Sequence, residues 1–93
     1  MTAIQESDIV RLPRGVRLRE DKQRGGWVLL APERVFQLDG IAQTVVSQVD
    51  GECSVGTIID RLCETYQAPR ERIAEDVTAM FAGLVEKRVL EVA

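Results

Sequence analysis

The spacing of apolar residues changes once along this chain, and that change limits the possible folds more than any other feature. Between residues 16 and 38, apolar side chains alternate with polar ones or form short runs, which is typical of strands. Between residues 39 and 87 they recur every three or four positions, which is typical of amphipathic helices. The pattern predicts an α+β fold in which a sheet precedes the helices, and 93 residues suit one domain.

The first half of the pattern predicts a three-stranded antiparallel sheet built as a meander. Residues 16–20 alternate between apolar and charged side chains. Residues 27–31 are apolar on both faces, so we expect them to form the central strand. A tight turn at residues 32–33, with proline first, leads into a third strand at residues 34–38.

Three helices are predicted after the sheet. Asp39 is placed to cap the first helix, which ends near residue 50. Ser54 is placed to cap the second, and the third extends from Pro69 to about residue 87. The last two helices are joined by a short break, which is typical of a helix-turn-helix. The predicted architecture is therefore winged helix-turn-helix-like.

The two ends of the chain show no clear period. Residues 1–12 mix polar and apolar side chains, so we expect a loosely ordered N-terminal arm there. Residues 13–93 are expected to form the single winged-helix-like domain. Within it, residues 88–93 are expected to be a short extended tail or a fourth small strand.

The composition excludes several classes of protein. The chain has no histidine, which rules out imidazole-based triads and histidine metal sites. Its two cysteines, Cys53 and Cys63, are too few for a structural zinc site or a secreted disulfide scaffold, so a reducing cytoplasm fits best. No apolar run approaches the ~20 residues that span a bilayer, so no membrane partner is expected.

A helix-turn-helix raises the possibility of DNA binding, but the charges argue against it. DNA-binding surfaces cluster Lys and Arg to neutralise phosphates. The would-be recognition helix, residues 69–87, carries three basic and four acidic side chains. The basic residues between positions 11 and 24 are interleaved with acidic ones, which favours a solvated strand face over a nucleic-acid patch. A winged-helix DNA-binding regulator is kept as the alternative function.

The carboxylates do not predict a catalytic site. Pairs such as Asp60 and Glu64 have the i, i+4 spacing of an exposed helix face. Cys63 falls on an apolar stripe, where a cysteine acts as a small hydrophobe. Cys53, in a loop, is a weak candidate for a reactive thiol. We therefore predict no catalytic residue and a binding protein rather than an enzyme.

The third strand is the best candidate for a binding surface. The first strand is rich in charged residues, which protect a sheet edge from pairing, whereas residues 34–38 carry one charge. An extended peptide can pair with such an edge, and the third helix can form the other wall of a groove. The candidate peptide-binding residues are Arg34, Val35, Phe36, Gln37, Leu38, Val77, Met80, Phe81 and Leu84. The same edge can instead form a homodimer, directly or by strand swapping.

The order of several segments resembles a known family. These are LPRGVRLRED, RGGWVLLAPERVFQLDG, VDGECSVGTIIDRLCETY and ERIAEDVTAMFAGLVEKRVLEV, which together cover about residues 12–92. They are similar to the pyrroloquinoline quinone (PQQ) biosynthesis protein D family, PqqD. One departure is Arg88, because the family commonly has glycine after the last helix.

The resemblance implies a peptide chaperone without a cofactor. Members of this family bind the ribosomally made precursor peptide of PQQ and present it to a radical S-adenosylmethionine (SAM) enzyme, which joins a glutamate to a tyrosine of the peptide. In related recognition domains the peptide adds to the third strand and rests against the third helix. Carried onto this chain, it pairs with residues 34–38 and faces the four helix residues named above. The basic face of the first strand, with Arg17 and Arg19, is a candidate surface for the enzyme.

Overall fold

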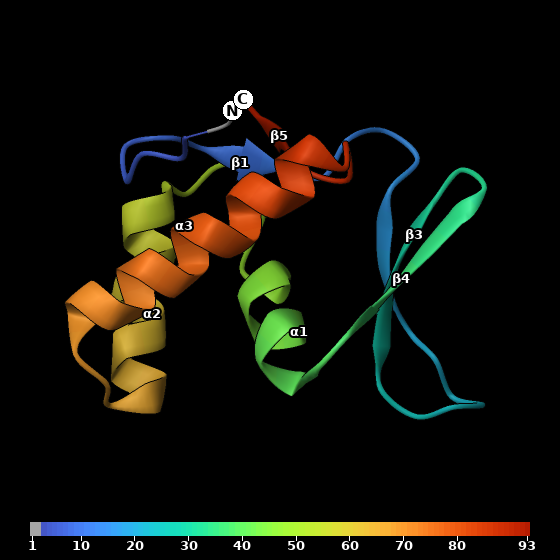
Figure 1. The fold of residues 1–93 in the computed structure, drawn as a ribbon, viewed down its shortest axis with the longest axis horizontal. Coiled ribbons are helices and arrows are strands. Elements are labelled where there is room, and N and C mark those ends of the chain that lie inside the picture. The colour runs from blue at the N-terminus through green and yellow to red at the C-terminus, as the bar shows by residue number, and fades with distance from the viewer. Residues whose placement is uncertain (1–2) are drawn as a thin grey trace.

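The computed structural model describes residues 3–93, which form a three-stranded sheet, three helices and a two-stranded ribbon (Figure 1). The predicted order of three strands followed by three helices is confirmed. The elements are β1 (Val10–Arg11), β2 (Arg17–Glu20), β3 (Trp27–Ala31), β4 (Arg34–Leu38), α1 (Gly40–Ser47), α2 (Val55–Tyr66), α3 (Arg70–Glu86) and β5 (Glu91–Val92).

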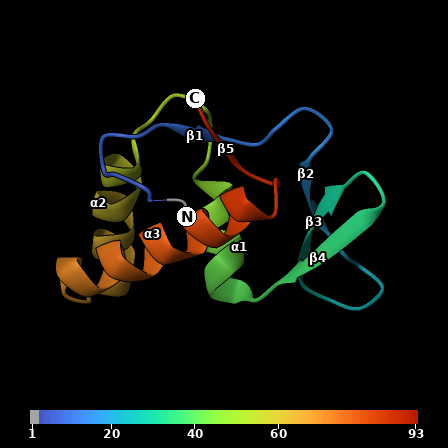
Figure 2. The ribbon, with the colours of Figure 1, turned by 45° about the horizontal axis from the view of Figure 1, so that its top comes forward.

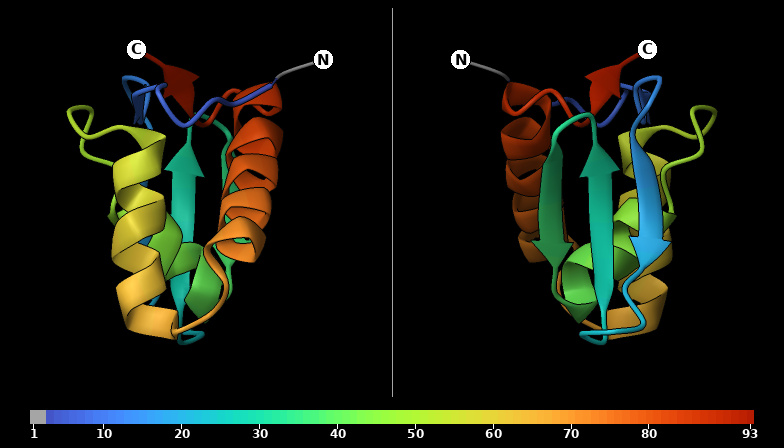
Figure 3. Two further views of the ribbon diagram at one scale, coloured as in Figure 1. Left: turned by 90° about the vertical axis from the view of Figure 1, so that its left-hand side faces the viewer. Right: turned by 90° about the vertical axis from the view of Figure 1, so that its right-hand side faces the viewer.

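The sheet has the antiparallel order β2-β3-β4, so the apolar strand β3 is central, as predicted. The helices lie on one face of this sheet, and Figure 3 shows the opposite face without a helix. Leu18, Leu29 and Phe36 stand opposite one another across the three strands. Leu29 is fully buried and joins the hydrophobic core, which therefore lies between the sheet and the helices.

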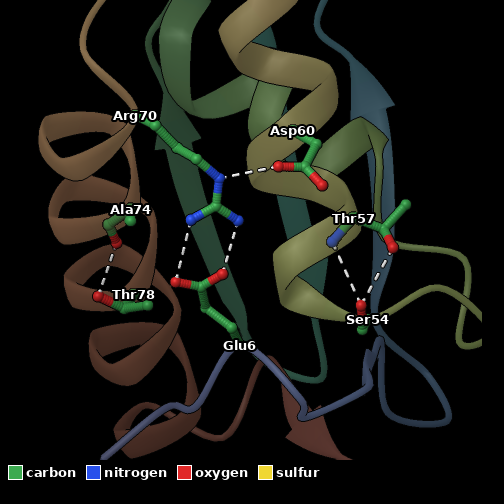
Figure 4. A network of polar contacts seen from close by, with 7 residues as sticks. All are labelled: Glu6, Ser54, Thr57, Asp60, Arg70, Ala74 and Thr78. Carbon is green, nitrogen blue, oxygen red and sulfur yellow. Dashed lines mark hydrogen bonds and ion pairs between the residues drawn. The ribbon is translucent and has the colours of Figure 1, made fainter.

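The helices supply most of that core. Each packs with one row of its amphipathic pattern, as expected for a helix on a sheet. The predicted caps of α1 and α2 are confirmed: Asp39 Oδ1 accepts a hydrogen bond from Ala42 N at 2.7 Å, and Ser54 Oγ accepts one from Thr57 N at 3.2 Å (Figure 4). Pro69 is the cap residue of α3 rather than its first residue. The buried helix residues are Val45, Val46, Val55, Ile58, Ile59, Leu62, Ile73, Val77, Phe81 and Leu84.

The prediction of a loose arm at residues 1–12 is wrong for the part that the structure describes; residues 1–2 lie outside it. β1 pairs with β5 at the other end of the chain (Figure 2), and Val10 is buried. The backbone oxygens of Asp8 and Glu6 accept hydrogen bonds of 2.8 Å from the N–H groups of Val55 and Gly56. The first turn of a helix has N–H groups without helical partners, and the N-terminal segment satisfies two of them.

Side-chain contacts hold the same segment against the helices. Arg70, the first residue of α3, donates hydrogen bonds to Glu6 at 2.6 and 3.2 Å and to Asp60 of α2 at 2.8 Å (Figure 4). The hydrogen bond from Arg70 lowers the pKa of Glu6 below its usual value. One guanidinium therefore joins the N-terminal segment, α2 and α3.

The C-terminus of α3 ends in a Schellman motif that contains Arg88. Val89 N donates to Leu84 O at 3.1 Å and Arg88 N donates to Val85 O at 2.9 Å, which are the two hydrogen bonds of that motif. Arg88 has φ 63°, the left-handed conformation that favours glycine. Arg88 therefore leaves the helix end intact but is an L-residue in a strained conformation.

We expect Arg88→Gly to stabilise the protein. Glycine removes the left-handed strain of ~1–2 kcal/mol and adds a smaller entropic cost in the unfolded chain, which leaves a net gain of about 0.5–1 kcal/mol. Arg88→Ala keeps the strain and is the matched control. Thermal unfolding of the three proteins measures this. Equal melting temperatures for Arg88→Gly and Arg88→Ala would contradict the assignment of strain to this residue.

Two helical glycines are expected to respond oppositely to alanine. A Cβ at Gly83 of α3 meets nothing within 4 Å, so Gly83→Ala should stabilise the helix by about 0.5–1 kcal/mol. A Cβ at Gly56 of α2 would lie 3.2 Å from Glu6 Oε1 and 3.3 Å from the Glu6 backbone oxygen. We expect Gly56→Ala to destabilise the protein by at least about 0.5 kcal/mol, because the N-terminal segment must shift. Urea denaturation measures both changes. Stabilisation by Gly56→Ala would mean that the segment does not pack on α2 as described.

Candidate functional site

The direction of each backbone group in the sheet follows from one contact in the β2–β3 turn. Asp21 N donates to Gly26 O at 2.8 Å, and these residues continue the register of the two strands. Antiparallel pairs alternate between hydrogen-bonded and non-hydrogen-bonded, so Arg19 and Val28, two positions on, form the next hydrogen-bonded pair. The backbone of Val28 therefore points to β2, and the backbone of Leu29 points to β4.

β4 exposes alternate backbone groups at its free edge. Phe36 stands opposite Leu29 and bonds with β3, so Val35 and Gln37 direct their N–H and C=O groups away from the sheet. Among residues 3–93, β4 has β3 as its single strand neighbour. The predicted edge position of this strand is confirmed, and it offers two donors and two acceptors to an incoming strand.

The side chains of β4 divide between its two faces. Phe36 and Leu38 are half-buried and pack against the core. Val35 and Gln37 project from the face without helices, and 63% of Val35 is exposed. Arg34 is also exposed and lies on the helix side, in register with Phe36. A peptide added to this edge would therefore meet apolar side chains on the helix side and Val35 on the other.

The structure divides the four residues predicted on α3. Val77, Phe81 and Leu84 are buried in the core, and Phe81 is fully covered. Met80 is half-buried, so its side chain reaches the surface. The predicted wall is thus mostly core, and the peptide contact of these four residues stays a prediction.

The accessible flank of α3 is the row next to that core row. Helical spacing puts Met80, Gly83 and Lys87 on one side of the helix. Lys87 approaches Phe36 of β4, with Nζ 5.8 Å from the ring centroid. The C-terminal end of α3 therefore places this flank beside β4. Gly83 has open space where a Cβ would stand. We call the space between this flank and the edge of β4 the β4–α3 groove.

An apolar cavity of about 220 Å³ lies between α1, α2 and the first half of α3. Ile41 and Tyr66, which line it, are 61% and 42% exposed, so it is open to solvent. Ile41 follows β4 by three residues, and Met80 lines the cavity from α3. The residues that the sequence analysis missed here are Ile41, Val45, Leu62, Tyr66, Ala68, Arg72, Ile73 and Asp76. Ile41 has the i, i+4 spacing of a core residue with Val45, so the sequence gives no signal that its side chain is exposed beside a cavity.

Arg34 and Lys87 close the other end of the groove. Arg34 Nη1 donates a hydrogen bond of 2.9 Å to the backbone oxygen of Lys87. Arg34 Cζ lies 5.4 Å from the centroid of the Phe36 ring, which Lys87 Nζ also approaches. The groove therefore has a cationic end beside the β3–β4 turn, and the apolar cavity beside α1 shares Met80 with its other end.

The shifted pKa values of the loop before α2 belong to its turn. Asp50 Oδ1 accepts hydrogen bonds of 2.9 Å from the backbone N–H groups of Cys53 and Glu52, which lower the pKa of Asp50 to about 2. Burial, and then the hydrogen bond and negative charge of Asp50, raise the pKa of the Cys53 thiol. A thiol with a raised pKa is a poor nucleophile, which weakens the case for Cys53 as a reactive residue.

Among residues 3–93, no group of three or more Cys, Asp or Glu side chains is arranged to hold a metal ion. No helix in this part of the chain has the length and hydropathy needed to cross a bilayer.

Comparison with known proteins identifies the family. The sequence pattern of the family described as "Coenzyme PQQ synthesis protein D (PqqD)" matches residues 26–90. The chain belongs to the PqqD family. The "PqqA binding protein" of Rhizobium meliloti is 46% identical over 89 residues, which are 96% of this chain and 91% of that protein. The predicted resemblance is confirmed, and relatives named for binding agree with the prediction of a protein that is not an enzyme.

A second relative places a PqqD segment within a longer protein. The "Bifunctional coenzyme PQQ synthesis protein C/D" of Methylorubrum extorquens is 52% identical over 90 residues, and this chain spans 24% of its length.

Two solved PqqD structures share the fold. The PqqD truncation of PqqCD from Methylobacterium extorquens, described as a functional stand-alone recognition element for ribosomally synthesized and post-translationally modified peptides, has a TM-score of 0.84 at 52% identity. The match covers 97% of this chain and 96% of that one. PqqD from Xanthomonas campestris has a TM-score of 0.60 at 42% identity and covers 86% and 89%. The predicted α+β class is therefore confirmed as the fold of a peptide recognition element.

Proposed function

We propose that this chain binds PqqA, the precursor peptide of PQQ synthesis, by adding it as a strand to β4 against α3. The observation that carries the proposal is the unpaired edge of β4 facing an accessible flank of α3. Relatives across more than nine-tenths of the chain are named PqqA binding proteins, which supports the identity of the peptide.

The chemistry of the groove suits an extended peptide. Val35 and Gln37 each present one backbone donor and one acceptor, which pair with alternate residues of an added strand. Met80 has a flexible, polarizable side chain that adapts to different apolar partners. The cavity lined by Met80 and Val77 can accept an apolar side chain of a peptide that continues past Leu38 toward Ile41. Hydrogen bonds thus give affinity and the apolar cavity gives selectivity.

Proline substitutions at the edge test strand addition. Val35→Pro and Gln37→Pro each remove one outward N–H and place a ring where the peptide backbone would lie, while the bonds to β3 remain. We expect each to weaken PqqA binding by about tenfold or more, which corresponds to about 1.4 kcal/mol. Isothermal titration calorimetry measures the affinity, and amide-shift titration of the labelled chain maps the contact.

Glu20→Pro is the matched control, because Glu20 also directs its N–H away from β3, but at the opposite edge. Thermal unfolding shows whether each variant is folded. Strand addition at β4 is wrong if folded Val35→Pro and Gln37→Pro bind PqqA as the wild type does. Sedimentation with and without PqqA distinguishes peptide binding from a homodimer, direct or strand-swapped, through the same edge.

We further propose that the chain presents PqqA to a radical SAM enzyme, with the outer face of the sheet as the enzyme contact. This face lies away from the helices (Figure 3) and carries Arg17 and Arg19, whose side chains alternate away from the core residue Leu18. Charged residues at a contact surface steer encounter with an acidic partner. In this proposal the chain itself holds no cofactor and makes no bond in the peptide.

Charge reversal tests the outer face. We expect the double variant Arg17→Glu/Arg19→Glu to bind the radical SAM enzyme about fivefold to tenfold more weakly at low salt, because two favourable charges become repulsive. Its affinity for PqqA should stay within about twofold, because the edge groups are on β4. Arg61→Glu, on α2, is the control. Unchanged affinity for the enzyme in a pull-down or calorimetric titration would exclude this face.

DNA binding finds less support in the structure. The exposed side of α3 carries Glu71 and Glu75, which would repel phosphates in a groove. A winged-helix regulator remains the alternative, and a steep dependence of nucleic-acid affinity on salt would favour it.

A further inference from the structure

Two cations meet at one end of the β4–α3 groove. The guanidinium of Arg34 and the ammonium of Lys87 both lie within 6 Å of the centroid of the Phe36 ring, at 5.4 and 5.8 Å. Arg34 is the first residue of β4, and Lys87 is the C-cap residue of α3. The fold therefore brings together two like charges that are 53 residues apart in the chain.

Neither cation has a carboxylate partner within the described residues. The ion pairs found among residues 3–93 involve Arg11 and Arg70, with N–O distances of 2.6 to 2.9 Å. Glu33 and Glu86 are the chain neighbours of Arg34 and Lys87, yet neither carboxylate lies within 4.0 Å of the two cations. The groove end thus carries two uncompensated positive charges in a protein whose net charge is −3.

Part of this arrangement has a structural explanation. The last carbonyls of a helix carry partial negative charge and attract cations. Arg34 meets this need through its hydrogen bond to the Lys87 oxygen. That bond uses one of the five guanidinium N–H groups and holds the side chain in place. The other N–H groups, and the three of the Lys87 ammonium, have no hydrogen-bond acceptor among the described residues and are free for a ligand.

We propose that Arg34 and Lys87 bind the carboxylate of one Asp or Glu side chain of the peptide. This inference rests on the proposed strand addition at β4. Arg34 and Phe36 project to the helix side of the strand, and a residue directly opposite in an added strand projects to the same side. The acidic residue therefore stands opposite Arg34 or Phe36 in the peptide. Its charge selects both the register and the segment of the peptide that binds.

A double-mutant cycle between the chain and PqqA tests this assignment. Lys87→Gln and Arg34→Gln remove one charge each, and each Asp or Glu of PqqA is replaced singly by its amide. We expect Lys87→Gln to weaken PqqA binding by about threefold to tenfold at low salt, with a smaller loss at high salt. One peptide substitution should weaken binding to the wild type by a similar factor and have little further effect on binding to Lys87→Gln.

The controls distinguish this proposal from the one on which it rests. Arg61→Gln removes the same charge from α2, away from the groove, and should bind as the wild type does. Lys87→Gln removes the ammonium but keeps the hydrogen bond from Arg34 to the backbone oxygen of residue 87. Its effect therefore reports the loss of the charge and not a change at the end of α3. The proposal is overturned if every acidic substitution acts independently of Lys87, or if Lys87→Gln binds PqqA like the wild type. Absence of binding by the wild-type chain would overturn strand addition itself.

Discussion

The packing of α3 through one row of its side chains is the contact on which the rest of the structure depends. Ile73, Val77, Phe81 and Leu84 face the core, where burial of apolar surface contributes most of the stabilising free energy. The adjacent row, with Met80 and Gly83, is left at the surface beside β4. The core row therefore stabilises the fold, while the adjacent row keeps an accessible surface beside β4.

The two ends of α3 are anchored by different interactions, and together they fix its position over the sheet. Arg70 connects the first turn to Glu6 and Asp60, although the pairs are exposed and each contributes little in water. The Schellman motif ends the helix and brings Val89 into the core. From there the chain reaches β5, which pairs with β1. The N-terminal segment thus closes the molecule by contacts with α2, α3 and β5.

The elements were predictable from sequence where the signal is local. The change of period located the strands and helices, and single residues such as Asp39 and Ser54 located helix starts because a cap bonds its own first turn. The loose arm was a wrong prediction because the partner of Val10 is Val92, at the other end of the chain. A two-residue strand carries no period to detect. The meeting of Arg34 with the end of α3 also depends on tertiary structure, and no spacing predicts it.

The division of α3 into core and groove could not be predicted for a related physical reason. An apolar stripe records that a side chain is covered, but the covering element is set by how the helix crosses the sheet. The edge position of β4 could be predicted from the sequence, because the outward direction of its backbone groups depends on strand order and register alone.

An edge without charges is a hazard for aggregation, and β2 avoids it with Arg17, Arg19 and Glu20. β4 has one charge, at Arg34, and that side chain turns to the helix side. The outward backbone groups of Val35 and Gln37 therefore stay available for pairing. Exposed backbone groups bond to water in the free chain. Under the proposed strand addition, hydrogen bonds to the peptide replace those to water, with a small net gain per bond. Binding of this kind is reversible, which suits the presentation of the peptide to an enzyme that we propose.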